Sequence, residues 1–325
     1  MFEKAWLASL LVFLGCASGP RESPPSELLG PFVHANLAVY VVRGEASDPR
    51  EYVTLDEGLR NGSVFLRETG EGEVDTLVVE NRSDRWLFLH AADIVTGGKQ
   101  DRTIAADVVV PPRSAAVDIA AFCVERGRWS GDSPEFAESN AIASGPLKLR
   151  IQRDRDQTGV WDEVAKQSED VAYLAGAPPL AALSSTGTYD AVVEHPAIRS
   201  KESAYVEALL PKIEAAPDAV GLIAAIGGEL TAADVYGSPE LFRSLAAKLL
   251  ASYAREAALA PEGKKAAPGA SAAARFLSEA EGQPDRDEQL SESMVRRTRE
   301  SESTVVFEYH DGTSGLLHRS IVTKK

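Results

Sequence analysis

Short runs of apolar residues alternate with polar turn residues between residues 35 and 126. The runs are rich in β-branched and aromatic side chains, and Gly, Asn, Asp and Ser separate them. They read ANLAVYVVRG, EYVTLDEGL, GSVFLRETG, EVDTLVVENRS and RWLFLHAADIV, and two further runs flank a Pro-Pro turn. This pattern predicts an antiparallel, β-rich unit over residues 35–126.

A helical spacing of apolar residues replaces this alternation from about residue 135 onward. The segment TGVWDEVAKQSEDVAYL places apolar residues on one face, with Thr158 available as an N-cap. The clearest helix follows Ser238, whose hydroxyl can cap the first turn, and Pro239 suits the first helical position. Its apolar stripe consists of Leu241, Phe242, Leu245, Leu249 and Tyr253. The C-terminal half is therefore predicted to carry the helices.

The last part of the chain changes composition. Residues 260–303 are rich in Ala, Pro, Gly, Glu and Arg and contain one short helical piece, SAAARFLSEAEG, which is typical of a solvated, low-complexity insert. The segment STVVFEYHDGTSGLLHRSIV that follows predicts a β-hairpin that rejoins the main sheet. Together these patterns predict an α+β fold with a single domain over residues 35–325.

Two Gly-Gly pairs stand between apolar runs, at residues 97–98 and 227–228, and each favours a hairpin turn. Only the first is followed by a polar run, KQDR. It is not a nucleotide P-loop, because a Gln replaces the hydroxyl residue and a strand follows where that motif needs a helix. The loop is either an anion-binding cradle or a charged hairpin tip in which the Asp pairs with the Lys or the Arg. The candidate ligand-binding residues are Gly97, Gly98, Lys99, Gln100, Asp101 and Arg102.

A second polar group, FCVERGRW at residues 122–129, closes the next predicted strand. Cys123 is either a thiol nucleophile beside two arginines or a buried, inert cysteine. Glu125 and Arg128 form either a structural ion pair or part of an acid–base site. Trp129 offers a planar surface on which a ligand can stack.

Other familiar chemistry is missing from the sequence. The five histidines show no metal-ligand spacing, so no metal site is predicted, and His90 lies in an apolar run as a core histidine would. The chain has neither a Gly-x-Ser-x-Gly elbow nor a dinucleotide-binding glycine fingerprint, and no cofactor is predicted. The net charge of −15 argues against a nucleic-acid partner.

The N-terminal residues MFEKAWLASLLVFLGCAS are typical of an export signal, because Lys4 precedes an apolar run too short to span a membrane. FLGC resembles a bacterial lipoprotein cleavage box, which implies a signal peptide over residues 1–16 and a lipid on Cys16. The alternatives are a plain secretory signal and a short uncleaved anchor. Residues 17–34, rich in Pro and Ser, predict a tether. We therefore expect a lipid-anchored protein of the cell envelope, at the outer membrane or periplasmic face of a Gram-negative host.

From about residue 36 onward the chain resembles the ARG and rhodanese-phosphatase-superfamily-associated protein domain, a bacterial family named for its gene neighbours. ENRSDRWLFLHAADIVTGGKQDR and CVERGRW are the most specific stretches. QTGVWDEV, SSTGTYDAV, AAIGGELTAADVYGSPELFRSLAAKLLASYAREA and VVFEYHDGTSGLLHRSIV are also similar. The resemblance implies the binding or processing of an ADP-ribose-like or other phosphorylated ligand. It groups Asp93 with the first polar loop, and it groups Cys123, Glu125, Arg128 and Trp129 in the second motif.

Three hypotheses about function follow. The first is a binding module in which Lys99 and Arg102 hold an anionic small molecule. The second is a hydrolase in which Asp93 or Glu125 is the general base and a cation of the loop stabilises developing negative charge. The third is a structural envelope lipoprotein with no small-molecule site. Both site hypotheses require the two polar motifs to converge in one pocket.

Overall fold

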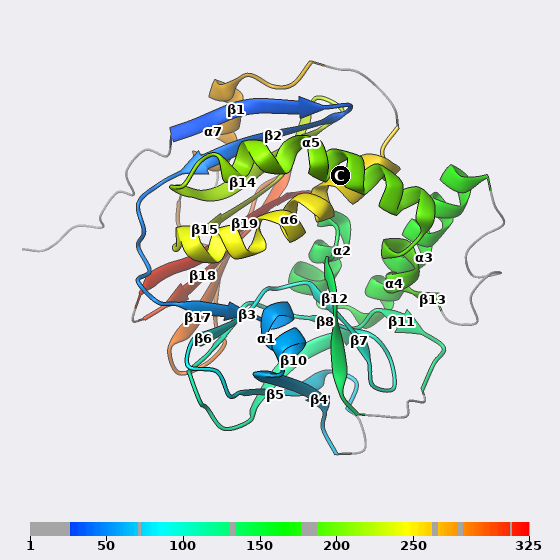
Figure 1. Ribbon diagram of the computed structural model, residues 1–325, viewed down its shortest axis with the longest axis vertical. Helices are drawn as coiled ribbons and strands as arrows, with labels where there is room; N and C mark the ends of the chain where they lie inside the picture. The colour runs from blue at the N-terminus through cyan, green and yellow to red at the C-terminus, as the bar shows by residue number, and fades with distance from the viewer. Residues whose placement is uncertain are drawn as a thin grey trace, which may run out of the picture.

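An eight-stranded antiparallel sheet forms one half of the molecule, in the order β1-β2-β14-β15-β19-β18-β17-β16 (Figure 1). The computed structural model describes residues 27–70, 73–129, 134–176, 187–261, 266–278, 282–312 and 314–324. The strands of this main sheet are β1 (Glu27–His34), β2 (Leu37–Arg43), β14 (Ala219–Ile226), β15 (Glu229–Tyr236), β16 (Arg286–Gln289), β17 (Met294–Glu300), β18 (Thr304–Asp311) and β19 (Gly315–Thr323).

A second, smaller β unit lies at the other end of the molecule (Figure 1). Its six-stranded sheet runs β12-β7-β8-β10-β5-β4, and its three-stranded sheet runs β3-β6-β9. The elements are β3 (Tyr52–Thr54), α1 (Leu55–Asn61), β4 (Val64–Glu68), β5 (Thr76–Asn81), β6 (Trp86–Leu89), β7 (Asp93–Gly97), β8 (Arg102–Ile104), β9 (Val108–Val110), β10 (Val117–Cys123) and β12 (Phe136–Ile142). Val53, Leu66, Leu77 and Leu87 belong to an apolar core of its own.

Helices fill the space beside and between these two β units. They are α2 (Gly145–Leu149), the π-helical turn η1 (Arg150–Asp154), α3 (Gln157–Ala175), α4 (Tyr189–Val193), α5 (Pro196–Glu214), α6 (Pro239–Leu259) and α7 (Ala270–Ser278). A two-stranded ladder of β11 (Glu125–Arg126) and β13 (Gly187–Thr188) joins the second polar motif to the start of α4. Helices α5 and α6 contact each other and cross the main sheet together (Figure 1).

Both faces of the main sheet are covered, and the alternation along β2 shows how. Leu37, Val39 and Val41 belong to the larger core, which also contains the inward residues of α5 and α6. Ala38 and Tyr40 face the other way, into a core that includes Phe276 of α7. Successive residues of a strand point to opposite faces, so a strand covered on both sides reads as the continuous apolar run LAVYVV.

The predicted α+β class is confirmed, and so are several of its elements. The second Gly-Gly pair, at residues 227–228, is the turn of the β14–β15 hairpin. The final predicted hairpin is β18–β19, and it lies inside the main sheet beside β15. Helix α6 begins as expected, because the Ser238 hydroxyl accepts a hydrogen bond from the Leu241 N–H at 3.2 Å. Its predicted apolar stripe is buried throughout.

Three predictions about boundaries need correction. The tether predicted to reach residue 34 ends earlier, because residues 27–34 form β1, where Leu29 and Phe32 pack on the larger core. The insert predicted over residues 260–303 contains β16 and β17 as well as the expected helical piece, α7. Helix α3 is capped by Asp156 and not by Thr158, because the Asp156 carboxylate accepts from two N–H groups of the first turn. The predicted signal peptide, Cys16 and residues 17–26 lie outside the described residues.

Candidate functional site

The two polar motifs meet because β8 and β10 are neighbouring strands. Arg102 lies opposite Cys123 in their antiparallel ladder, which brings the Gly-Gly loop beside the second motif. The guanidinium of Arg128 donates to the carbonyl oxygen of Gly98 at 2.8 Å and to the Glu125 carboxylate at 2.6 Å. The two motifs therefore lie side by side. Both site hypotheses also required a common pocket, and the cleft of about 590 Å³ is lined by other residues.

The polar run of the loop nevertheless points into the protein. Gln100 and Asp101 are each 6% exposed and Arg102 is fully buried. Arg102 donates to the carbonyl oxygen of Gln100 at 2.8 Å, and its guanidinium lies 3.5 Å from the carboxylate of Glu68 on β4. This run is thus no solvent-exposed hairpin tip, because its guanidinium is part of the interior.

Asp101 fixes the shape of the same loop. Its carboxylate accepts from the Gly97 N–H at 3.0 Å and from the Thr188 hydroxyl at 2.6 Å, and it lies 3.2 Å from the guanidinium of Arg128. Outside this network, the Lys99 ammonium lies 5.4 Å from the centre of the Trp129 ring, a cation–π distance. Several of the loop's polar groups are therefore engaged by other groups of the protein itself.

The second motif has a similar character. Cys123 is buried, and burial raises the pKa of its thiol to about 11, so the thiolate is scarce at neutral pH. Glu125 is 2% exposed, and the Nε of Arg128 donates to both of its carboxylate oxygens at 2.9 Å. These contacts support the structural interpretation of the ion pair and the core interpretation of the cysteine.

Asp93 lies in a different cluster. Its carboxylate is 2.7 Å from the Nζ of Lys248 on α6, and it accepts from the N–H of His90 at 3.2 Å. The same Nζ forms an ion pair with Asp56 on α1. Burial raises the pKa of Asp93 to about 7 although the charge of Lys248 opposes this change. All three charged side chains are nearly or fully buried, so a lysine between two carboxylates forms the link between α6 and the smaller β unit.

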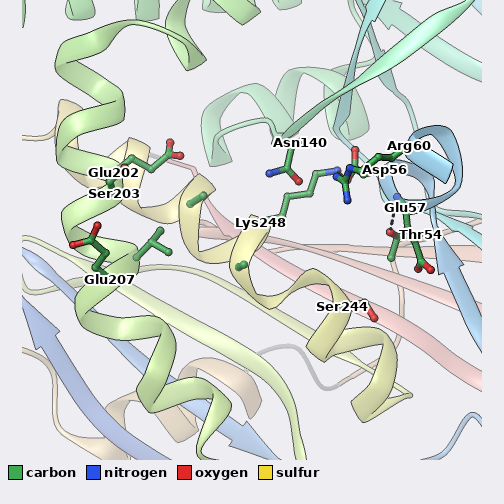
Figure 2. A pocket seen from close by; sticks show the side chains of 13 residues that line it. Thr54, Asp56, Glu57, Arg60, Asn140, Glu202, Ser203, Glu207, Ser244 and Lys248 are labelled. Atoms are coloured by element: carbon green, nitrogen blue, oxygen red, sulfur yellow. Dashed lines mark hydrogen bonds and ion pairs between the residues drawn. The ribbon is translucent and has the colours of Figure 1, made fainter.

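A cleft of about 590 Å³ opens directly above this cluster (Figure 2). It lies between α1 and β12 on one side and α5 and α6 on the other. Figure 2 shows Lys248 extending from α6 toward Asp56, with Asn140 close by. The cleft is lined by Thr54, Asp56, Glu57, Arg60, Asn140, Glu202, Ser203, Val206, Glu207, Ser244, Ala247, Lys248 and Ala251.

The lining is polar and more acidic than basic. Four carboxylates, those of Asp56, Glu57, Glu202 and Glu207, stand against the cations of Arg60 and Lys248. Asp56 is 5% exposed, and among the described residues its Oδ1 has no hydrogen-bond partner. A buried carboxylate oxygen with an unused lone pair is rare in folded proteins, and here it belongs to a side chain on the cleft floor.

Asn140 reaches the cleft from an irregular stretch of backbone. Its φ is +52°, and the pairing of β12 with β7 changes register between Glu138 and Ile142. Asparagine adopts this left-handed conformation more readily than most residues. The bulge thereby turns one amide side chain of a strand toward the cleft.

None of the residues that line this cleft was among the predicted site residues, because they come from four separate segments of the chain. One signal was available in α6. Lys248 falls on the inward face of the helix, between Leu245 and Ser252, where a lysine is buried only if a partner neutralises it. The Asn140 bulge and the acidic residues of α5 carry no comparable mark in the sequence.

Comparison with known families identifies the family of the chain. The family model of the ARG and Rhodanese-Phosphatase-superfamily-associated Protein domain matches residues 26–322, and the chain belongs to this family. Comparisons with curated proteins and with solved structures yield no match. Within the described residues, no helix is both long and apolar enough to cross a membrane.

Proposed function

We propose that this member of the family binds an uncharged, polyhydroxylated small molecule of the sugar class in the cleft between α1, β12, α5 and α6. The observation that carries the proposal is the lining, in which four carboxylates and the Asn140 amide face one cavity. The volume of about 590 Å³ lies within the usual range for small-molecule sites.

The chemistry of the lining selects the class of ligand. Sugar hydroxyls are hydrogen-bond donors, and carboxylates and amide oxygens are acceptors with several lone pairs each. Carboxylates still exceed cations when the ion-pair partners of the lining are counted, and this excess repels a phosphate or another anion. Those partners are Arg85 for Glu57, Arg255 for Glu202, Glu138 for Arg60 and Asp93 for Lys248. This changes the expectation of an anionic ligand held by the Gly-Gly loop, because Asp101, Arg102 and Arg128 of that network bind one another or their neighbours. Of an ADP-ribose-like molecule, the ribose suits the cleft better than the pyrophosphate.

A ligand panel tests binding. Thermal unfolding is measured with neutral sugars and with the matching sugar phosphates, for the wild type and for the double variant Asn140→Gly, Glu207→Gln. Glycine tolerates the left-handed backbone of residue 140, so this variant removes the amide without adding strain. Glu169→Gln, an exposed change on α3, is the matched control. For each protein, the Tm with a ligand is compared with the Tm of the same protein without it.

We expect at least one neutral sugar at about 100 times its Kd to raise the Tm of the wild type and of the control by about 5 °C. The double variant is expected to show no such rise. The parent sugar should bind more tightly than its phosphate. A panel with no active neutral sugar, or a rise that persists in the double variant, would contradict the proposal.

Hydrolysis of the bound ligand is the second candidate function, and the free oxygen of Asp56 favours it. A general base must reach the water or hydroxyl that it deprotonates, and Asp56 lines the cleft. Asp93 lies behind Lys248, and Glu125 is held by Arg128, so Asp56 replaces both as the proposed base. Asp56→Asn is expected to retain binding and to lose turnover of a glycoside substrate. Turnover that survives this change would assign the base elsewhere.

We further propose that the protein is exported and anchored in the cell envelope through a lipid on Cys16. The support is the FLGC box and the Pro- and Ser-rich segment after it. Membrane fractionation tests this, because Cys16→Ser should move the protein from the membrane to the soluble fraction. If both forms of the protein are soluble, the N-terminus is a plain secretory signal. If both remain in the membrane fraction, it is an uncleaved anchor.

A further inference from the structure

A second buried polar cluster lies where the main sheet meets the smaller β unit. We call it the histidine cluster, and it consists of His90, Asp107, Asp234 and His318. His90 and Asp107 come from loops next to β6 and β9, whereas Asp234 and His318 lie on the paired strands β15 and β19. All four side chains are at most 1% exposed.

The outer nitrogen of each histidine is held by an acceptor. His90 Nδ1 lies 2.5 Å from the carbonyl oxygen of Ala91, and His318 Nδ1 lies 2.7 Å from the Asp107 carboxylate. The other oxygen of Asp107 accepts from the Ala91 N–H at 2.6 Å, which ties the two histidine supports together. A ring nitrogen that faces a carbonyl or carboxylate acceptor carries a proton, so a neutral His90 ring has its lone pair on Nε2. The Nε2 of His318 also faces a carboxylate, so the His318 ring has a lone pair there only when its second ring proton is absent.

The inner atoms face one another. His318 Nε2 is 3.1 Å from Asp234 Oδ1, and among the residues described no hydrogen-bond partner lies near the buried Nε2 of His90. One nitrogen of each histidine and one oxygen of Asp234 lie within 4.8 Å of one another. His90 therefore presents an unused lone pair to a carboxylate and to a second imidazole.

We propose that the histidine cluster is a binding site for one divalent transition-metal ion, with His90 Nε2, His318 Nε2 and Asp234 Oδ1 as ligands. Two imidazoles and one carboxylate are a donor set that zinc and its neighbours prefer. Zn–N bonds of about 2.0 Å place tetrahedral ligands roughly 3.3 Å apart, so the present spacing needs only a small inward movement of the side chains.

The groups around the three proposed ligands also favour a bound metal ion. The carboxylate behind His318 and the carbonyl behind His90 are the outer partners that usually orient metal-binding histidines. Lys148 at 3.3 Å and the Tyr253 hydroxyl hold the other oxygen of Asp234 and fix its orientation. With both imidazoles neutral, the two carboxylates of Asp107 and Asp234 exceed the one positive charge of Lys148, so the cluster favours one added cation, either a proton on His318 or a metal ion.

Burial gives this site a structural role. Its ligands have no exposed surface through which an ion enters the folded protein, so the metal is taken up as the chain folds. Because its ligands come from both β units, the ion joins those units. The site lies outside the cleft lining, and its test does not depend on the proposed sugar binding.

Metal content after refolding is the primary test. The full chain is refolded from denaturant with ZnCl₂, freed of loose metal by gel filtration, and analysed for zinc per chain. The variants are His90→Gln and His318→Gln at the ligands, and Asp107→Asn behind one ligand. His34→Gln, a change on the edge strand β1 and away from the cluster, is the matched control.

We expect about one zinc per chain in the wild type and in the control, and a loss of roughly 10- to 100-fold in affinity for Asp107→Asn. His90→Gln and His318→Gln should retain less than about a tenth of the zinc. Cobalt(II) titrated during refolding of the wild type should give the visible bands of a low-coordinate site. Because the cobalt titration uses the wild type, it tests for a metal site even if a ligand variant does not fold.

A wild type that refolds without metal and gives no cobalt bands overturns the proposal, and a proton on His318 is then the cation between Asp107 and Asp234. Zinc bound equally well by His90→Gln overturns it too. Loss of zinc in the ligand variants with sugar binding intact would support the metal site alone, since the two sites are read by different measurements.

Discussion

The guanidinium of Arg128 lies 3.2 Å from the carboxylate of Asp101, and this ion pair connects two loops that are 27 residues apart in the chain. Arg128 also binds the carboxylate of Glu125 and the carbonyl oxygen of Gly98. The side chain of Arg128 thus contacts residues of both polar motifs. These contacts link the loop between β7 and β8 to the segment that follows β10.

Removal of this arginine should be costly. Arg128→Ala leaves the 3% exposed side chain of Glu125 without its main cation, and breaking a buried pair costs about 3 kcal/mol of the free energy of unfolding. Urea denaturation measures the change. Arg199→Ala, which removes one partner of the exposed Arg199–Glu194 pair, should change stability by less than about 1 kcal/mol. Equal losses of stability in the two variants would show that the Arg128–Glu125 ion pair contributes no more than an exposed pair.

The two Gly-Gly turns should differ in their tolerance of a side chain. A Cβ at Gly98 would lie 2.6 Å from Phe136 and 2.9 Å from Glu68, and the φ is +53°. Gly227 has a similar φ of +60° but no atom within 4 Å of such a Cβ. We expect Gly227→Ala to cost about 1 kcal/mol from backbone strain alone, and Gly98→Ala about 1–3 kcal/mol more from overpacking. Thermal unfolding of both variants under one buffer condition checks the order.

Acid should weaken the main sheet through Glu308. Burial raises the pKa of this carboxyl, but His310, Arg319 and Arg299 lower it more, to about 2 from an ordinary 4.5. A pKa that is lower in the folded state stabilises the protein above the unfolded value. That contribution, on the order of 3 kcal/mol, is lost as pH falls from about 4.5 to about 2.

Urea unfolding of the wild type and Glu308→Gln at several pH values measures this effect. The difference in stability between the two proteins should shrink as pH falls through that window. A difference that is constant with pH would show that Glu308 does not change its pKa on folding.

The thiol of Cys123 should be unreactive in the folded protein. A pKa raised from 9.0 to about 11 reduces the thiolate fraction about 100-fold at pH 8, and burial limits access further. A chain with Cys16→Ser leaves Cys123 as the single thiol for a colorimetric disulfide reagent. Labelling should be at least about 100-fold slower in buffer than in denaturant. Fast labelling in buffer would revive the nucleophile hypothesis.

Sequence patterning predicted the interior of the fold better than its edges. The central strands are covered on both faces, so their runs of apolar residues identify them directly. Of the strands of the main sheet that were missed, β1 and β16 are its two edges, and β17 lies next to β16. An edge strand buries little, tolerates proline as at Pro31, and carries charge as in RDEQ, so its sequence looks like a tether or an insert.

The candidate site was also predicted only in part. The two polar motifs meet, as the site hypotheses required, because each stands at the end of a neighbouring strand. Whether a charged loop faces solvent or the interior depends on what covers it, and sequence does not show that Thr188 and Glu68 do so. His90 and His318 are far apart in sequence, so a search by ligand spacing does not connect them.

Strand β19 lies between β15 and β18, and this position has a consequence for synthesis of the protein. The main sheet is divided into two separate parts until residues 315–323 have left the ribosome. A nascent chain that ends before His318 has neither the central strand nor the partner of Asp107. The complete eight-stranded sheet therefore requires translation of this strand, whereas β1, β2, β14 and β15 can pair before it.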